Sequence, residues 1–230
     1  MKLSILIPVY NEINTIETII KKVQAVEVEK EIVLVDDCSK DGTREYLKKV
    51  YGSGKANVKV IYHEKNQGKG TAVRTALSNA SGKYVVIQDA DLEYDPLDLK
   101  ALLVLAEKNN KDAIFGSRFL KTWKATTLPH YLINKFLTEL SNILFGGRLT
   151  DMETCYKMVK TDIMKSLNLR ANRFELEPEI TAKLLKRKCD IAEVPIYYKS
   201  RSYKEGKKIN WRDGVHALVA ILKLKFKGTL

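Results

Sequence analysis

Three carboxylates follow directly on an apolar run in the stretch VVIQDADLEYDP. They are Asp89, Asp91 and Glu93, and the preceding residues 84–87 are β-branched or aromatic, as is typical of a buried parallel strand. Asp89 and Asp91 are one residue apart, so both side chains can point to the same side of an extended chain, where they repel each other unless a cation lies between them. The spacing favours a divalent-metal site at the end of a strand, and a solvated acidic loop is the alternative.

A second acidic pair and a glycine-containing run could serve the same site. Asp36 and Asp37 end another apolar run, and an acid at that position commonly accepts hydrogen bonds from ribose hydroxyls or base N–H groups. The run QGKG at 67–70 could present backbone N–H groups and the Lys69 ammonium to an anion, but by itself it is a weak glycine signal that an ordinary turn explains better. Its spacing matches neither GxxxxGK[ST] nor GxGxxG, so the two common phosphate-binding loops are not indicated.

Strand-like and helix-like segments alternate along the first half of the chain. Strands are expected at 2–7, 32–35, 58–62, 84–87 and 113–116, with helices beginning near 16, 43, 71 and 97. This alternation predicts an α/β fold with a mostly parallel sheet, whose ligands bind outside the carboxyl ends of the strands.

The second half has a different pattern. An amphipathic helix is expected at 128–146, with four apolar residues on one stripe: Leu132, Phe136, Leu140 and Leu144. Residues 150–159, TDMETCYKMV, mix acids with a short strand-like end. A helix at 177–187, a strand at 191–197, a basic and mobile loop at 199–210 and a tail helix at 211–226 are expected to follow.

Composition limits the classes of protein. The 230 residues suffice for one large domain with an appendage, and 40 Lys and Arg against 28 Asp and Glu give a net charge of +12, which favours phosphorylated ligands, nucleic acid or an anionic membrane as partners. The three cysteines lack metal-ligand spacing and predict reduced thiols in an intracellular protein. No secretion signal and no apolar run of about 18 residues is evident, so we expect a cytoplasmic protein that is soluble or peripheral at the cytoplasmic membrane face.

Eight motifs together resemble a known family. They are LSILIPVYNE, VLVDDCSKDGT, HEKNQGKGTAVRTAL, VVIQDADLEYDP, FGSRF, TDMETCYK, NRFELEPEIT and RSYKEGKKINWRDG. Their combination resembles the inverting GT-A glycosyltransferases of family two, in the branch similar to dolichyl-phosphate mannose synthases. The resemblance implies a Rossmann-like GT-A catalytic domain at 1–210, with a mostly parallel sheet flanked by helices, and a C-terminal amphipathic basic helix at 211–230.

The resemblance also implies a reaction. The family branch transfers a sugar from a nucleotide-sugar donor to a polyprenyl phosphate, so the implied activity is hexose transfer with inversion. Mannose from GDP-mannose is the best match, and a UDP-sugar such as UDP-glucose is the alternative.

Site residues follow by position in the matching motifs. Those around the donor nucleoside are Pro8, Tyr10, Glu12 and Asp36, with Lys69 near the donor. Asp89 and Asp91 match the acids that hold Mg²⁺ or Mn²⁺, and Glu93 is a third candidate ligand. Arg118 matches an arginine that meets the acceptor phosphate, and Arg201 and Lys207 match basic loop residues that close over the diphosphate. Where relatives carry a further acceptor-site arginine, this chain has only His130 and Lys135.

Two points remain open from the residues alone. A phosphate acceptor is already anionic near neutral pH, with its second pKa near about 6, so it needs little help from a base; Asp91 or Asp151 is the candidate if one exists. The tail helix combines basic residues with an apolar stripe, which suits a membrane interface or packing on the domain.

A non-catalytic module that binds RNA or another polyanion is the competing class. The densest basic run is confined to 199–212, acids line the strand ends and no RNA-binding aromatic signature is present, so nucleic acid is not expected as a partner. The sequence gives no indication of the oligomeric state.

Overall fold

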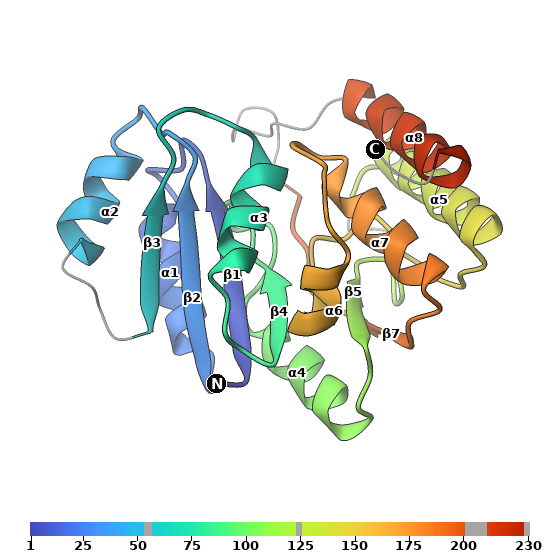
Figure 1. Ribbon diagram of the computed structural model, residues 1–230, viewed down its shortest axis with the longest axis horizontal. Helices are drawn as coiled ribbons and strands as arrows, with labels where there is room; N and C mark the ends of the chain where they lie inside the picture. The colour runs from blue at the N-terminus through green and yellow to red at the C-terminus, as the bar shows by residue number, and fades with distance from the viewer. Residues whose placement is uncertain (53–56, 123–125, 201–210, 228–230) are drawn as a thin grey trace.

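The structure is a computed structural model that describes residues 1–52, 57–122, 126–200 and 211–227, the last segment without the side chains of 211–213. A seven-stranded sheet is flanked by helices on both faces (Figure 1). The strands are β1 (Leu3–Val9), β2 (Lys30–Asp36), β3 (Val58–Tyr62), β4 (Tyr84–Ile87), β5 (Ala113–Ser117), β6 (Lys157–Lys160) and β7 (Ile191–Pro195). The helices are α1 (Ile16–Ala25), α2 (Thr43–Tyr51), α3 (Lys69–Ser78), α4 (Asp98–Lys108), α5 (Leu128–Phe145), α6 (Thr161–Ser166), α7 (Leu176–Lys186) and α8 (Trp211–Phe226).

The sheet is parallel except for one strand. Its order is β3-β2-β1-β4-β6-β5-β7, and β6 pairs antiparallel with both β4 and β5. The predicted α/β fold with a mostly parallel sheet is therefore confirmed. The reversed strand has a direct consequence for function: the segment that precedes β6 lies at the same edge as the carboxyl ends of the parallel strands.

Strand β1 continues two residues beyond its predicted end. Its pairing with β4 stops at Leu6, opposite Ile87, whereas its pairing with β2 continues to Val9, opposite Asp36. Pro8 has no N–H to donate, and it lies where β4 no longer pairs with β1. The strand can therefore carry a proline although it is central in the sheet.

Helix α5 buries a different face from the one expected. Its buried residues are Leu137, Thr138, Ser141 and Phe145, while Leu132 is 56% and Phe136 is 58% exposed. The predicted stripe of Leu132, Phe136, Leu140 and Leu144 is thus wrong for its first two members. The helix is apolar over most of its circumference, so the apolar spacing alone could not identify its buried face.

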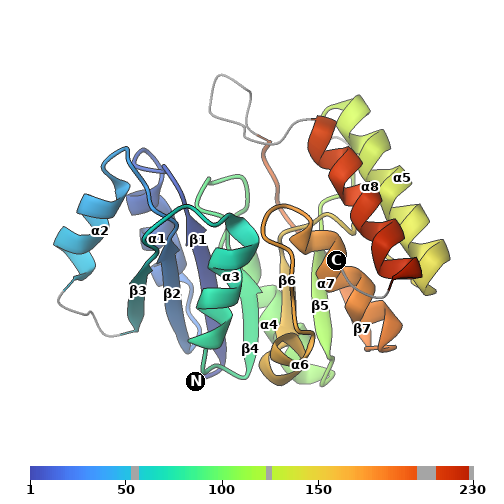
Figure 2. The ribbon, with the colours of Figure 1, turned by 45° about the horizontal axis from the view of Figure 1, so that its top comes forward.

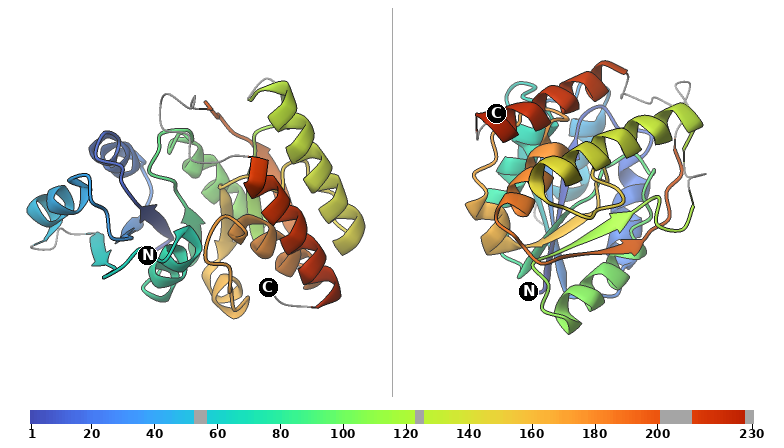
Figure 3. Two further views of the ribbon diagram at one scale, coloured as in Figure 1. Left: turned by 90° about the horizontal axis from the view of Figure 1, so that it is seen from above. Right: turned by 90° about the vertical axis from the view of Figure 1, so that its right-hand side faces the viewer.

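Helix α8 lies alongside α5 and also contacts α7 (Figures 2 and 3). Residues of the three helices and Met152 form a second, smaller core, separate from the core around the sheet: Leu137, Phe145, Met152, Ala182, Ala217, Ile221 and Leu224. Within the described residues, no helix is both long and apolar enough to cross a bilayer. The membrane-interfacial role of residues 211–230 stays a prediction.

Candidate active site at the carboxyl edge of the sheet

A cavity of about 630 Å³ opens at the edge where the parallel strands end. Its walls come from the residues after β1, β2, β4 and β5, from the start of α3, from the segment before β6, and from α5, α7 and α8. Parallel strands expose their chemistry at this edge. Both halves of the chain thus contribute side chains to one pocket.

One end of the cavity is formed by the residues expected around a nucleoside. Pro8, Tyr10 and Glu12 all line it. Asp36 does not, because it is fully buried and its Oδ2 accepts a hydrogen bond from Arg44 Nε at 2.6 Å. The acid of this pair that lines the cavity is Asp37, which the sequence analysis did not select. Neighbouring residues of an extended chain point in opposite directions, so only one of the two acids could face the pocket.

The glycine-containing run uses its amides within the chain, as the alternative of an ordinary turn implied. Asp37 accepts hydrogen bonds from the N–H groups of Gln67, at 3.0 Å, and Gly68, at 2.8 Å. The N–H of Gly70 donates to the carbonyl of Asn172 at 2.8 Å. Position 70 must be glycine because a Cβ there would collide with the backbone of Ala171. The run is therefore a tight connection that places Lys69 at the start of α3.

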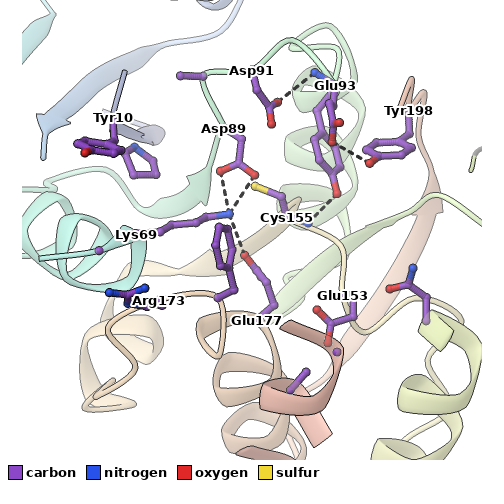
Figure 4. A pocket seen from close by; sticks show the side chains of 18 of the residues that line it. Tyr10, Lys69, Asp89, Asp91, Glu93, Glu153, Cys155, Arg173, Glu177 and Tyr198 are labelled. Carbon is purple, nitrogen blue, oxygen red and sulfur yellow. Dashed lines mark hydrogen bonds and ion pairs between the residues drawn. The ribbon is translucent and has the colours of Figure 1, made fainter. Parts of the chain in front are cut away.

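Oppositely charged side chains alternate through the middle of the cavity (Figure 4). Lys69 Nζ lies 2.8 Å from Asp89 Oδ1 and 3.5 Å from Glu177 Oε1. The other oxygen of Glu177, Oε2, pairs at 2.5 Å with Nζ of the fully buried Lys157. Burial alone would lower the pKa of Lys69, but Asp89 and Glu177 raise it well above its usual range. Lys69 therefore stays charged beside Asp89.

Asp91 and Glu93 follow Asp89 but have different environments. Asp91 lines the cavity, and its Oδ1 accepts a hydrogen bond from the backbone N–H of Glu93 at 3.1 Å. Glu93 is buried, and its Oε2 accepts a hydrogen bond from the hydroxyl of Tyr198 at 2.8 Å. Glu93 also lines the cavity, and Tyr198, which contacts it, lies three residues after β7. Its role as a third metal ligand stays a prediction.

The donor set fits a hard divalent cation without a third carboxylate. No group of three His, Cys, Asp or Glu side chains that could hold a metal ion is present in the described part of the chain. Mg²⁺ is usually bound through one or two carboxylates, with substrate phosphates and waters as the remaining ligands. Asp89 and Asp91, which both line the cavity, match that requirement.

Arg118 lines the cavity on the side of β5 and is held by Asp151. Arg118 Nε donates to Asp151 Oδ2 at 2.7 Å, and Nη2 donates to Oδ1 at 2.8 Å. Burial alone would lower the pKa of Arg118, but Asp151 raises it well above its usual range, so the guanidinium stays charged. Asp151 itself is fully buried and both its oxygens are used by Arg118. This engagement removes Asp151 as a candidate base.

Two further residues of the cavity were missed by sequence reasoning. The first is Arg173, from the loop before α7. Lys135, which was considered for the acceptor site, instead pairs with Glu139 at 2.7 Å on the outside of α5. Glu153, two residues after Asp151, also lines the cavity, and its Oε1 is buried without a hydrogen-bond partner among the described residues. The sequence carried no separate signal for either residue beyond membership of the motifs NRFELEPEIT and TDMETCYK.

The end of the cavity that α5 and α8 form is mainly apolar. Pro129, Ile133 and Leu137 of α5 form it together with Gly214 and Ala217 of α8. His130, expected in the acceptor site, lines the same end. Arg201 and Lys207 lie outside the residues that the structure describes.

Comparison with known proteins identifies the family. A model of glycosyl transferase family 2 matches residues 4–167. The chain belongs to this family. It is therefore a glycosyltransferase, as expected from the motifs. The family match includes the cavity residues Pro8, Tyr10 and Glu12, the acids Asp89 and Asp91, and Arg118.

Relatives and structural neighbours agree with this assignment. The chain is 32% identical to a dolichol-phosphate mannosyltransferase of Pyrococcus furiosus, across 90% of this chain and 59% of that longer protein. It is 29% identical to a UDP-N-acetylglucosamine–dolichyl-phosphate N-acetylglucosaminyltransferase of Methanococcus voltae, across 96% of this chain and 95% of that protein. Glucosyl-3-phosphoglycerate synthase of Mycobacterium tuberculosis, solved with Mn²⁺, uridine diphosphate and phosphoglyceric acid, superposes with a TM-score of 0.69 at 18% identity, covering 96% of this chain and 78% of that one. The GT-A fold is thereby confirmed.

Proposed function

We propose that this protein transfers a hexose from a nucleotide sugar to a polyprenyl phosphate, with inversion at the sugar carbon. The observation that carries the proposal is one continuous cavity with Asp89 and Asp91 in its middle, Arg118 beyond them and an apolar end between α5 and α8. Such a cavity suits a diphosphate, a second phosphate and a hydrocarbon chain in that order. The names of the two dolichyl-phosphate relatives support the same acceptor class.

The donor is proposed to be GDP-mannose, with a UDP-sugar as the alternative. One relative is named for mannose and the other for a UDP-linked N-acetylhexosamine, so the acceptor class has stronger support than the donor. Pro8, Tyr10 and Glu12 line the part of the cavity that would hold the nucleoside.

Charged side chains of the cavity can stabilise the leaving diphosphate and position the acceptor phosphate. Asp89 and Asp91 would hold Mg²⁺ or Mn²⁺, which supplies positive charge to the leaving diphosphate. Lys69 stays protonated beside Asp89 and adds a fixed positive charge at the same place. Asp151 fixes the plane of the Arg118 guanidinium, whose fork geometry matches phosphate oxygens. Arg201 and Lys207 are proposed to close over the diphosphate.

A panel of nucleotide sugars tests the donor and the metal together. With Mn²⁺ present, we expect one guanine or uracil nucleotide sugar to raise the unfolding temperature, because a ligand that binds only the folded state stabilises it by about 2.7 kcal/mol at one hundred times its Kd. Without Mn²⁺ the stabilisation should be largely lost. Equal stabilisation with and without metal, and no sugar transfer to a prenyl phosphate, would favour a non-catalytic nucleotide-binding module.

An anionic membrane surface is proposed as a partner because two exposed apolar stripes lie on neighbouring helices. On α8 the stripe consists of Val215, Val219, Leu222 and Phe226, and on α5 it includes Leu128, Leu132 and Phe136. Phe226 is 78% exposed, Lys225 directly precedes it and Lys223 lies three residues before it. Apolar side chains with flanking lysines are typical of helices that lie in a membrane interface.

The double variant Phe136→Ser/Phe226→Ser is expected to bind anionic phosphatidylglycerol vesicles at least about tenfold less tightly in sedimentation than the unaltered protein. Burying one phenylalanine stabilises by about 1.5–3 kcal/mol, and a loss of 1.4 kcal/mol is a factor of about ten. Both side chains are exposed, so folding should not change. Leu97→Ser is the matched control, since Leu97 is 65% exposed and lies outside both stripes. Equal sedimentation of all three proteins would contradict a membrane role for these helices.

A further inference from the structure

Glu153 is a carboxyl group in the cavity that the transfer step described above does not use. One of its oxygens, Oε1, is buried and has no hydrogen-bond partner within the described residues. A buried carboxylate oxygen without a donor is costly, so the position favours either the neutral acid or a ligand that supplies a partner.

The position of Glu153 places it on the acceptor side of the cavity. Figure 4 shows Tyr10 at one side and Glu153 at the other, with Lys69 and Asp89 between them. Glu153 follows Asp151, which holds Arg118, by two residues, and both Arg118 and Glu153 line the pocket. A phosphate that met Arg118 would therefore come close to the Glu153 carboxyl.

The charged groups around Glu153 do not neutralise the negative charge of its ionised carboxylate. Those that act on it come from β6, α7, the end of β5 and the segment before β6: Lys157, Glu177, Arg118 and Asp151. Lys157 is already paired with Glu177, and Arg118 with Asp151. His130 of α5 is a further titratable group of the same cavity. Burial, opposed by Lys157 and reinforced by Glu177, raises the pKa of Glu153 to about 7.

We propose that Glu153 binds the acceptor in its protonated form, donating a hydrogen bond from its carboxyl O–H to an oxygen of the phosphate dianion. This inference rests on the proposed acceptor and adds a residue to its recognition. Binding then takes up a proton from solvent onto Glu153, because a dianion beside the carboxyl favours the neutral acid. When the acceptor oxygen forms its bond to the sugar carbon, the bond from that carbon to the donor's diphosphate breaks, and the nucleoside diphosphate leaves with the electron pair. The acceptor phosphate is then a diester with one negative charge fewer, and the proton on Glu153 can return to solvent.

A role as a base fits the same observations less well. A phosphate monoester is already mostly the dianion at neutral pH, with its second pKa near about 6, so there is little proton for a base to remove. A charged Glu153 would also repel the acceptor. The neutral acid removes that repulsion and gives the orphaned carboxyl a partner.

The test is calorimetric titration of the full chain with geranyl phosphate, a short prenyl phosphate, between pH 6.5 and 8.5. We expect the Kd of the unaltered protein to rise above pH 7, approaching tenfold per pH unit, because one proton must be bound with the ligand. Titrations in two buffers of different ionisation enthalpy should show uptake of roughly half a proton or more at pH 7.5. In Glu153→Gln, which keeps the shape and cannot ionise, both the pH dependence above pH 7 and the proton uptake should vanish. Glu139→Gln, on the outside of α5, should behave as the unaltered protein.

The outcomes separate this inference from the proposed function. Geranyl phosphate binding with a flat Kd above pH 7, or with the same slope in Glu153→Gln, would overturn the role of Glu153 and leave the acceptor class standing. If Glu153→Gln changed the affinity for nucleoside diphosphate with Mn²⁺ as much as the affinity for geranyl phosphate, Glu153 would belong to the donor site. That result would also overturn the proposed role of Glu153 in acceptor binding. No binding of geranyl phosphate by any variant, with nucleotide binding intact, would refute the acceptor and this inference together.

Discussion

Replacing Asp91 with alanine is expected to lower turnover at least about a thousandfold while the protein stays folded. Asp91 lines the cavity and is one of the two carboxylates proposed to hold the divalent ion. An ion at the leaving diphosphate stabilises the transition state by several kcal/mol, and about 4 kcal/mol corresponds to a factor of a thousand. The side chain is partly exposed and accepts a hydrogen bond from the nearby N–H of Glu93, so its loss should cost little stability.

Initial rates at saturating donor would measure this loss, and thermal unfolding gives an independent readout. The stabilisation by nucleotide and Mn²⁺ should disappear in Asp91→Ala, whereas the unfolding temperature without ligand should change little. Asp190→Ala is the matched control, because Asp190 lies at the opposite end of the sheet and pairs with Lys111 at the surface. Full activity of the Asp91 variant would overturn the proposed catalytic role of this acid.

Replacing Asp151 with alanine is expected to lower the free energy of unfolding by about 3–5 kcal/mol. Asp151 is fully buried and makes two hydrogen bonds with the Arg118 guanidinium and a third with the Arg118 backbone N–H, at 3.0 Å. Without Asp151 a buried positive charge has no partner, and such a charge is far more costly than the pair itself.

Urea denaturation at neutral pH would measure the change. The same substitution in an exposed pair, Asp190→Ala beside Lys111, should cost less than about 1 kcal/mol. The double variant Arg118→Met/Asp151→Leu should regain much of the loss, since it removes both charges and retains the volume. A cost below 1 kcal/mol for Asp151→Ala would show that Arg118 finds another partner or water.

The fold was predictable where the hydrophobic pattern and the turn residues agree. Strands at 58–62 and 84–87 and the helix at 211–226 match the structure residue for residue. The direction of β6 was not predictable, because four residues that include Lys157 and Lys160 carry too little pattern to separate parallel from antiparallel pairing. The short helix α6 was missed for the same reason, since six residues give fewer than two turns.

The sequence predicted at which strand ends the site lies, but it predicted less well which side chains face the cavity. Asp89, Asp91, Lys69 and Arg118 all line one cavity, as their positions after parallel strands implied. The choice between Asp36 and Asp37 depended on the direction in which the side chain of Asp36, the last residue of β2, points. The amino-acid sequence does not contain that information. Glu153 required the structure, because its burial and lack of a partner are properties of its surroundings.

The two halves of the chain supply different parts of the cavity, because the reversed strand β6 brings the second half to the edge where the parallel strands end. Residues up to 91 supply the nucleoside end and the two acids, while the apolar end comes from residues 126 onward. On the proposed assignment, donor choice and acceptor choice are thus encoded in separate, consecutive segments. The contact of Lys69 with both Asp89 and Glu177 joins the two segments, so exchanging the later segment between relatives could change the lipid used while leaving the sugar the same, provided Glu177 is retained.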